Sequence, residues 1–441
     1  MSTDDRYPPD ASSARVAREA LASAVRADNV AEVRSVLHQY PALKAGLDDP
    51  MQPDHAFGAT PLLAAVYNGN REMVDVLLHA GASIDARSHW WAGGFGVLDA
   101  EGDLAPFLIE RGATIDIHAA ARLGKLEKVT ELLSTGPELV HARGGDGQTP
   151  LHFAATVAIA EYLLDRGADI DARDVDHEST PAQWMVRNRQ EVARALVERG
   201  CRTDILMAAA LGDALIVRRH LDEDPRCIRT TVSARYFPMR NPRAGGTIYN
   251  WTLGTDKSAH ALAREFGHEH VLDILMAHTP DPLKLAVACE LGNAETVAAL
   301  LEADPHLAQS LDDEARLKIA EAARNNGVQA VELMLEAGWP VDARGQHGGT
   351  PLHWAAWHGN TRMAEALLRR RAPLEVTDRD FSSTPLGWAL YGSVHGPSRE
   401  RGDYAGTVEA LLRAGAETPR PDSVTAASDA VREVLRKYAR P

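Results

Sequence analysis

The chain has 441 residues, a formal net charge of −15 and only 5% aromatic residues. The excess of acidic residues argues against a surface built for the phosphate backbone of a nucleic acid, which needs basic stripes, and it disfavours binding to an anionic membrane surface. No segment approaches the roughly 18 consecutive apolar residues of a membrane-spanning helix. We therefore expect neither a nucleic acid nor a membrane as partner.

The N-terminal segment, residues 1–15, is polar and contains prolines, so we expect a disordered tail. It lacks the basic start and apolar stretch of a signal peptide, which predicts a cytoplasmic protein. Cys201, Cys227 and Cys289 are far apart and form no CxxC pair. This spacing predicts reduced thiols rather than a disulfide framework or a zinc site.

A Thr-Pro pair recurs along the chain, at residues 60–61, 149–150, 180–181, 350–351 and 384–385. The threonine hydroxyl can cap a helix N-terminus, and proline suits the first helical position because its missing N–H is not needed there. After Thr350, an apolar stripe of Leu352, Ala355 and Ala356 predicts a short helix that ends at Gly359. Each pair therefore predicts the first helix of a repeat.

A second pattern predicts the second helix of each repeat. Valine is followed three and four residues later by two large apolar residues, which gives one buried helix face. The triplets are Val33/Val36/Leu37, Val74/Leu77/Leu78, Val129/Leu132/Leu133, Val271/Ile274/Leu275, Val297/Leu300/Leu301, Val331/Met334/Leu335 and Val408/Leu411/Leu412. A Gly-Ala-x-Ile-Asp ending follows at residues 81–85, 112–116 and 167–171.

Together these elements resemble the ankyrin repeat, a turn plus two antiparallel helices with a Thr-Pro-Leu-His-x-Ala signature and a period of about 33 residues. The resemblance implies an all-α, curved solenoid of about twelve helix-turn-helix units with short β-turn fingers, some of them degenerate. It also implies that His152 and His353, the signature histidines, serve structure by hydrogen bonding to neighbouring backbone.

Four segments depart from the repeat. Residues 88–98 replace an ordinary finger and helix start, residues 156–160 lack the usual turn, residues 229–257 form an insertion, and residues 392–405 extend a turn. Val431, Val434 and Leu435 predict a final amphipathic helix that covers the exposed end of the stack. We expect a tail at 1–15, a repeat array at 16–418 and a capping helix at 419–441.

In the ankyrin family, fingers and first helices line a concave groove that usually binds a partner. If the same positions of this chain line such a groove, most of the candidate ligand-binding residues are aromatic residues or histidines. They are His89, Trp90, Trp91, His177, Tyr236, Arg243, Tyr249, Trp251, His347, Trp354, Trp357, His358, Asp380, Trp388 and Tyr391. We further predict that residues 89–91 and 176–178 converge on one pocket. The insertion would contribute Tyr236, Arg243, Tyr249 and Trp251 to this pocket.

Asp176, His177 and Glu178 form the sharpest polar cluster. In an extended finger the two carboxylates project to the same face, about 7 Å apart. Such a pair is what an inverting glycoside hydrolase uses as acid and base, although finger tips are also simply polar. A metal site of His89, His177 and Glu178 has no supporting ligand spacing, so we predict no metal and no other cofactor.

Two functions stay open at this point. The first is a recognition scaffold that binds a protein or other ligand in the groove. The alternative is a small-molecule or carbohydrate-binding enzyme, glycoside hydrolase-like, with Asp176 and Glu178 as catalytic residues in the same groove. The expected partner is accordingly a protein, or a small polar ligand or glycan, and we expect a monomer.

Overall fold

The computed structural model describes residues 11–51, 56–100, 102–418 and 427–438, and within them it is helical, without a β-strand. The chain divides into two compact bodies. We call residues 1–211 with 230–257 the N-terminal body, and residues 212–229 with 258–441 the C-terminal body.

The N-terminal body contains α1 (Ala11–Arg26), α2 (Val30–Gln39), α3 (Pro61–Tyr67), α4 (Arg71–Ala80), α5 (Ala105–Glu110), α6 (Ile117–Arg122), α7 (Leu126–Thr135), α8 (Pro150–Phe153), α9 (Val157–Asp165), α10 (Pro181–Met185), α11 (Gln190–Glu198) and α12 (Ile205–Leu211). Its short turns are η1 (Pro41–Gly46), η2 (Ala56–Gly58), η3 (Pro137–His141), η4 (Gly145–Gly147) and the π-helical η6 (Asn250–Gly254).

The C-terminal body contains α13 (Ala214–Glu223), α14 (Ala259–Glu265), α15 (Glu269–His278), α16 (Asp281–Glu290), α17 (Ala294–Ala303), α18 (Asp313–Arg324), α19 (Val328–Ala337), α20 (Pro351–Trp357), α21 (Thr361–Arg369), α22 (Pro385–His395), α23 (Tyr404–Arg413) and α24 (Asp429–Tyr438). Its short turns are η5 (Pro225–Arg229), η7 (Leu307–Ser310) and η8 (Gln346–Gly348). The all-helical repeat array predicted from the sequence is confirmed.

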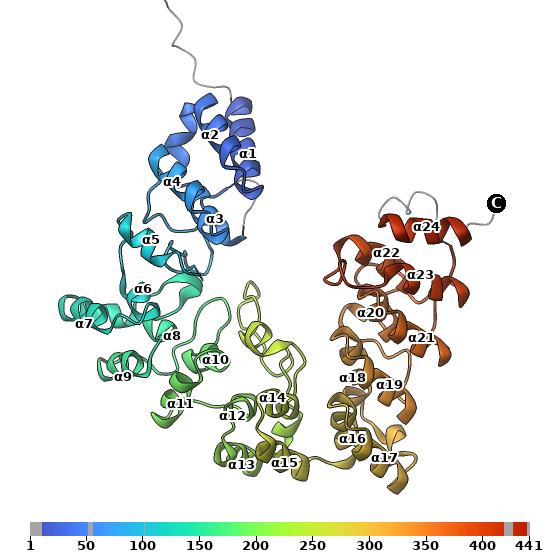
Figure 1. Ribbon diagram of the computed structural model, residues 1–441. Coiled ribbons are helices and arrows are strands. Elements are labelled where there is room, and N and C mark those ends of the chain that lie inside the picture. Colours follow the sequence, from blue (N-terminus) through green and yellow to red (C-terminus); the bar gives the residue numbers. More distant parts are fainter. Residues whose placement is uncertain (1–10, 52–55, 101, 419–426, 439–441) are drawn as a thin grey trace, which may run out of the picture. The chain divides into compact units, whose positions relative to one another are not determined.

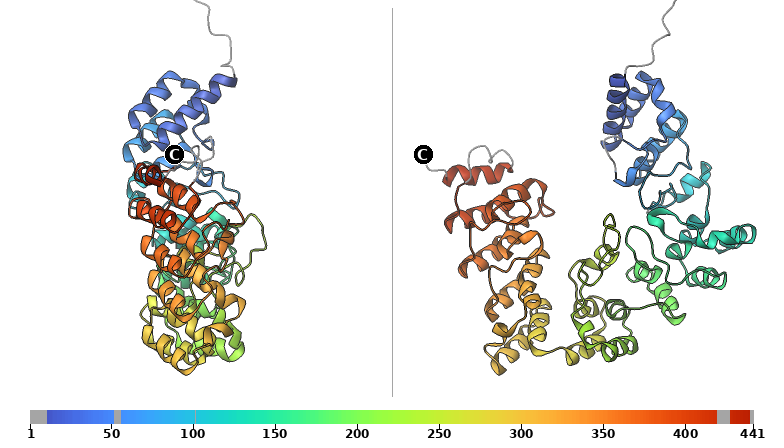
Figure 2. Two further views of the ribbon diagram at one scale, coloured as in Figure 1. Left: turned by 90° about the vertical axis from the view of Figure 1, so that its right-hand side faces the viewer. Right: turned by 180° about the vertical axis from the view of Figure 1, so that it is seen from behind.

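Successive helix pairs stack on their neighbours within each body. In the C-terminal body, first helices α16, α18, α20 and α22 contact one another in turn, and so do second helices α17, α19, α21 and α23. Figures 1 and 2 show this run as one continuous stack, with α24 lying against its last pair. A helix at the predicted capping position therefore covers α23, while residues 419–426 lie outside the described residues.

The Thr-Pro pairs open helices as predicted. The hydroxyls of Thr60 and Thr384 each accept a backbone N–H three residues on, at 3.3 Å. In the repeats that start at Thr149 and Thr350, the signature histidine reaches back instead, and its Nδ1 accepts the threonine N–H at 3.1 Å. Both devices satisfy donors that a helix N-terminus leaves without partners.

The second-helix triplets form the core. The leading valine of every triplet is at most 4% exposed. Full burial of a side chain of this size contributes about 1.5–3 kcal/mol, but one repeat offers nothing to bury it against. The stability of the array is therefore shared between neighbouring repeats.

The degenerate segments appear where the sequence places them. Residues 88–98 form no helix, and α8 ends after Phe153, so its repeat is short. The shortened turn leaves backbone carbonyls without helical partners. Arg189 donates to two of them, the carbonyls of His152 at 3.0 Å and Ala154 at 3.1 Å.

The N-terminal boundary differs from the prediction. Helix α1 begins at Ala11, so the predicted tail boundary at residue 15 falls inside a helix. Residues 1–10 lie outside the described residues. The apolar positions of α1, among them Leu21 and Val25, are buried in the core of the first repeats, so this helix belongs to the repeat array.

Candidate functional site

One aspartate organises the finger that precedes α10. The carboxylate of Asp174 accepts backbone N–H groups of His177 and Ser179, both at 2.7 Å. It also accepts the indole N–H of Trp184 at 3.4 Å. Asp174 is 2% exposed, and its bonds fold residues 174–179 into a fixed bend rather than a strand.

The finger before α22 repeats this construction. Asp378 accepts the backbone N–H groups of Phe381 at 2.6 Å and Ser383 at 3.0 Å, and the indole N–H of Trp388 at 2.9 Å. We call the bend around either aspartate the finger frame. The frame fixes the direction of the side chains at its tip, and these side chains differ between the two bodies.

In the N-terminal body, Asp146 joins three fingers. It lies in η4 with a left-handed backbone, φ +54°, a conformation that aspartate tolerates better than most residues. Its carbonyl accepts the N–H groups of Val175 at 2.8 Å and Asp176 at 3.2 Å, and its own N–H donates to the carbonyl of Gly93 at 3.3 Å. The Asp146 carboxylate is thereby held beside the tip of the Asp174 frame.

The insertion closes over this tip. The backbone N–H of Gly245 donates to Asp176 Oδ1 at 3.2 Å, and the Nδ1 of His177 bonds to the carbonyl of Gly246 at 2.8 Å. Asp146, Asp176 and His177 are 6%, 5% and 8% exposed. The insertion therefore buries a polar cluster that would otherwise lie at the surface.

Glu178 does not share a face with Asp176. Its backbone is left-handed, φ +45°, so the predicted extended finger is wrong at this residue. Its carboxylate accepts the backbone N–H of Asn241 at 2.8 Å and of Arg240 at 3.0 Å, whereas Asp176 bonds to Gly245. Each carboxylate thus holds a different part of the insertion.

Burial sets the charge balance of the cluster. It raises the pKa of Asp146 to about 6, with His177 opposing the shift and the carboxylates of Asp176 and Asp174 adding to it. Burial also raises the pKa of Asp174. In the other body burial acts on Asp378 in the same direction, but the hydrogen bonds from its own frame outweigh it and lower the pKa.

Two predicted tryptophans join the cluster. The indole N–H of Trp90 donates to Asp146 Oδ1 at 2.9 Å. The chain turns after Trp90, and the rings of Trp90 and Trp91 contact each other with centroids 6.2 Å apart. The guanidinium of Arg243, from the insertion, lies 4.5 Å from the centre of the Trp91 ring.

The other predicted residues of this region lie apart. His89 is exposed, and Trp251 is 73% exposed. Tyr249 is fully buried with its hydroxyl on Asp204 at 2.9 Å, which makes it a core residue. Tyr236 lines a cavity of about 600 Å³ between the finger and the insertion. The predicted convergence thus includes Trp90, Trp91, Asp176, His177 and Arg243, but not Tyr249 or Trp251.

An aromatic groove lies at the tip of the Asp378 frame. Its volume is about 600 Å³, and we define it by its lining residues, His347, Trp354, Trp357, Phe381, Ser383, Gly387, Trp388 and Tyr391. The rings of Trp354 and Trp388 meet edge to face at 4.9 Å, and those of Trp357 and Tyr391 are nearly parallel at 6.2 Å. Five predicted aromatic or histidine residues on different helices and fingers therefore share one surface.

Polar groups flank this groove. His347 Nδ1 donates to Asp380 Oδ2 at 2.9 Å, and Arg379 Nε donates to Asp380 Oδ1 at 2.7 Å. The bond from Arg379 lowers the pKa of Asp380, with His347 acting in the same direction. The predicted His358 is not a lining residue, because its Nε2 donates to the carbonyl of Arg324 at 2.7 Å.

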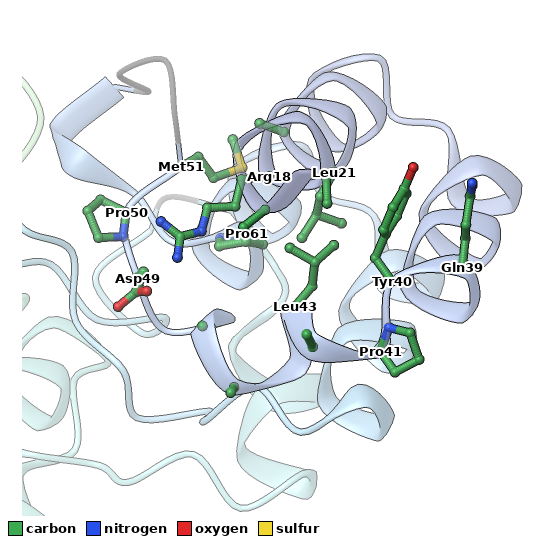
Figure 3. Close-up of a pocket in the computed structure, with 16 residues that line it drawn as sticks. Arg18, Leu21, Gln39, Tyr40, Pro41, Leu43, Asp49, Pro50, Met51 and Pro61 are labelled. Atoms are coloured by element: carbon green, nitrogen blue, oxygen red, sulfur yellow. The ribbon is translucent and has the colours of Figure 1, made fainter. Parts of the chain in front are cut away.

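A further cavity of about 700 Å³ lies in the first repeats and is lined by α1, η1 and neighbouring residues. Figure 3 shows Tyr40, Leu43, Met51 and Pro61 around it, with Arg18 reaching toward Asp49 and Pro50. None of the predicted site residues lines this cavity.

Sequence reasoning missed four residues. Asp146 lies between glycines in a finger turn. Its acidic side chain was the only sign in the sequence that this residue has a role beyond forming the turn. Phe381 matches His177 in the finger alignment, and that alignment would have placed it at the tip. Asp174 and Asp378 occupy the same position before the Ser-Thr-Pro sequence of their fingers, a repeat-to-repeat match that indicates a structural role.

Comparisons with known proteins agree with the repeat structure. A model of ankyrin repeats in three copies matches residues 117–207 and 285–380, and a single ankyrin-repeat model matches residues 57–89. The chain belongs to the ankyrin-repeat family.

Among similar proteins, the E3 ubiquitin-protein ligase XB3 of Oryza sativa subsp. japonica is 35% identical over 109 residues, 24% of this chain and 24% of that protein. The E3 ubiquitin-protein ligase KEG of Arabidopsis thaliana is 22% identical over 301 residues, 62% of this chain and 18% of that protein. The chain thus spans a quarter or less of the length of these two relatives.

The crystal structure of the human ASB11 ankyrin repeat domain matches 54% of this chain and 99% of its own, with 19% identity and a TM-score of 0.34. Among the described helices, none is long and apolar enough to cross a membrane. The three cysteines are free thiols, two of them buried.

Proposed function

We propose that this protein is a recognition scaffold and that it binds an apolar segment of a partner protein in the aromatic groove of the C-terminal body. Membership of the ankyrin-repeat family supports a scaffold, because repeat solenoids offer extended binding surfaces. The cytoplasmic location and monomeric state expected from the sequence fit such a role and remain predictions.

The observation that carries the proposal is the exposure of large aromatic side chains within the groove. Phe381 is 65% exposed and Tyr391 is 55% exposed. Aromatic residues are enriched at the centres of protein interfaces, where they contribute most of the binding energy. Leaving two such rings in water is unfavourable, and a partner that covers them would remove this cost.

The groove's chemistry indicates the kind of segment. The flat rings of Trp357 and Tyr391 suit stacking against an aromatic or proline ring, since both present broad apolar faces. The ion pair of Asp380 with Arg379 and His347 forms a polar rim. An extended segment with one or two apolar anchors fits a groove of this composition and size.

The carbohydrate-processing alternative is less well supported. It requires Asp176 and Glu178 to act as acid and base across one substrate. Glu178 lines the cavity beneath the insertion, whereas Asp176 belongs to the buried cluster with His177 and Asp146. Both carboxylates already accept backbone N–H groups of the insertion, which gives each a structural role.

A peptide-display selection on the full chain tests the proposal. We expect enrichment of peptides with apolar or aromatic anchors, and we expect Phe381→Ala with Tyr391→Ala to weaken the selected peptides at least ~30-fold, as for interface hot spots. Both side chains are largely exposed, so their removal leaves the core intact.

The matched control is Trp251→Ala, which removes a still more exposed ring outside the groove. It should leave peptide binding unchanged. The proposal is wrong if no peptide is enriched, if the groove variants bind as well as the wild type, or if Trp251→Ala weakens binding as much as they do.

A further inference from the structure

Three buried side chains of the N-terminal body point one atom each at a common place. His177 Nε2 lies 3.6 Å from Asp176 Oδ2 and 3.9 Å from Asp146 Oδ2. One ligand-type atom from each residue lies within 4.8 Å of the other two. These separations exceed hydrogen-bond length, so the three atoms face one another without bonding.

The opposite atom of each side chain is fixed by a hydrogen bond. Asp146 Oδ1 accepts the indole N–H of Trp90 at 2.9 Å, and Asp176 Oδ1 accepts the N–H of Gly245 at 3.2 Å. A carbonyl can only accept, so the bond to Gly246 places the proton of a neutral His177 ring on Nδ1. The lone pair of Nε2 then faces the two carboxylates.

The two carboxylate oxygens that face His177 receive no hydrogen bond from the described part of the protein. Among the described residues, none donates a hydrogen bond to Oδ2 of Asp146 or Asp176, and no Lys or Arg forms an ion pair with either carboxylate. Asp174 adds a third buried negative charge nearby. Carboxylates as deeply buried as these are normally paired with a cation or coordinate a metal.

We infer that Asp146, Asp176 and His177 form a binding site for one divalent transition-metal ion, with Zn²⁺ the best match. Two carboxylate oxygens and one imidazole nitrogen, each able to approach an ion to about 2.0–2.2 Å, leave a fourth position for water. Ligands at those distances lie about 3.4 Å apart in tetrahedral geometry. The two separations from Nε2 are a few tenths of an ångström longer, and the two carboxylate oxygens lie within 4.8 Å of each other, so an ion would draw the three atoms together by small side-chain movements.

The ligand set separates this ion from others. Mg²⁺ and Ca²⁺ prefer oxygen ligands throughout, whereas imidazole favours Zn²⁺ and its neighbours in the transition series. The bonds on the far atoms, including a backbone carbonyl on histidine Nδ1, are the supports that metal-binding histidines and carboxylates usually have. The residues of the earlier metal hypothesis differ, since His89 is exposed and the Glu178 carboxylate is engaged with Asn241.

The site joins parts of the chain that are far apart in sequence. Its ligands come from two fingers, and their supports come from a third finger and from the insertion. An ion at this place therefore fastens residues 245–246 to the finger array. This role is independent of the aromatic groove, which shares no residue with the cluster.

Metal content and affinity of the full chain test the inference. After chelator treatment and addition of Zn²⁺, we expect one tightly bound equivalent per chain by mass spectrometry of the metal, and Co²⁺ in its place should give a visible absorption band. Asp146→Asn and Asp176→Asn conserve shape, and asparagine tolerates the left-handed backbone at 146. Each should weaken Zn²⁺ binding at least ~100-fold.

Two further variants separate the site from nonspecific binding by the 18 histidines of the chain. Trp90→Phe removes only the support of Asp146 and should weaken Zn²⁺ about 10-fold. His347→Ala removes a histidine at the equivalent finger tip of the other body and should leave affinity unchanged.

Circular dichroism of each metal-free variant confirms that it is folded. The inference is overturned if the wild type retains no Zn²⁺. It is also overturned if the folded Asp146→Asn and Asp176→Asn variants bind as tightly as the wild type, or if Mg²⁺ competes with Zn²⁺ at equal concentration.

Discussion

The fingers around Asp174 and Asp378 share one backbone construction and carry different chemistry. In each, the aspartate accepts two backbone N–H groups and one indole N–H. A signature histidine also bonds to the serine at the end of each bend. His152 donates to the carbonyl of Ser179 at 3.2 Å, and His353 donates to the carbonyl of Ser383 at 3.0 Å. The backbone frame is therefore the same in both bodies.

The tip residues make the difference. Where the N-terminal body has Asp146 and His177, the C-terminal body has His347 and Phe381. The first pair lies buried under the insertion, and the second borders an open aromatic groove. The comparison teaches that the frame sets where tip side chains point, while the tip residues and the covering segment decide between an enclosed polar site and an exposed apolar one.

The largest effect should come from breaking the frame itself. Asp174→Ala and Asp378→Ala each leave three donors without an acceptor, and an unsatisfied buried donor costs about 1–3 kcal/mol. We expect each variant to lose about 3 kcal/mol or more of unfolding free energy, measured by chemical denaturation. Glu400→Ala, at an exposed loop position, should change stability by less than about 0.5 kcal/mol. A small loss in either aspartate variant would show that the frame is not shared.

A second effect concerns pH and the signature histidines. Burial lowers the pKa of His152 to about 3 and also lowers the pKa of His353. The unfolded chain takes up a proton near pH 6.5 and the folded chain does not, so stability is lost as pH falls below 6.5 toward 3. Between pH 7 and pH 5, His152 accounts for about 2 kcal/mol of this loss, and His353 adds to it in the same direction.

The chain supplies the matched variant for this test. Gln183 occupies the equivalent position after Thr180, and its side chain accepts the Thr180 N–H at 3.0 Å. His152→Gln should therefore fold, and its denaturation midpoint should fall less between pH 7 and pH 5 than that of the wild type. An equally steep fall would contradict a neutral buried His152.

The sequence predicted the fold and the local structure of each repeat, but not the bend around Asp174 and Asp378. The Thr-Pro pairs, the valine-led triplets and the signature histidines were all interpreted correctly, because each depends on contacts within one repeat or with the next. The shortened repeat at residues 156–160 was also visible as a missing turn.

The site was harder to predict because it depends on contacts between distant segments. The left-handed backbone of Glu178 separates two carboxylates that an extended finger would have put together. The insertion covers His177, and no local pattern states which finger an insertion will cover. Tyr249 was assigned to a binding surface but is buried, since its partner Asp204 lies 45 residues earlier.

The smallest expected effect is a difference in stability between the finger around Asp174, which the insertion covers, and the finger around Asp378, which no insertion covers. Ser179 Oγ accepts the N–H of Ile248 at 3.1 Å and donates to the carbonyl of His177 at 2.8 Å. Ser179→Ala should therefore cost about 1–2 kcal/mol. The equivalent Ser383→Ala removes no such bond to an insertion and should cost less than about 0.5 kcal/mol. Equal losses on denaturation would mean that the insertion adds nothing to the stability of its finger.

Hydrogen–deuterium exchange of the full chain with and without a selected peptide tests the central claim most directly, because one experiment reports on both fingers. If the open aromatic tip is the recognition surface, the peptide should slow exchange at residues 346–358 and 381–391 and leave residues 146–178 unchanged. Protection confined to residues 146–178, with none around Phe381 and Tyr391, would contradict the account.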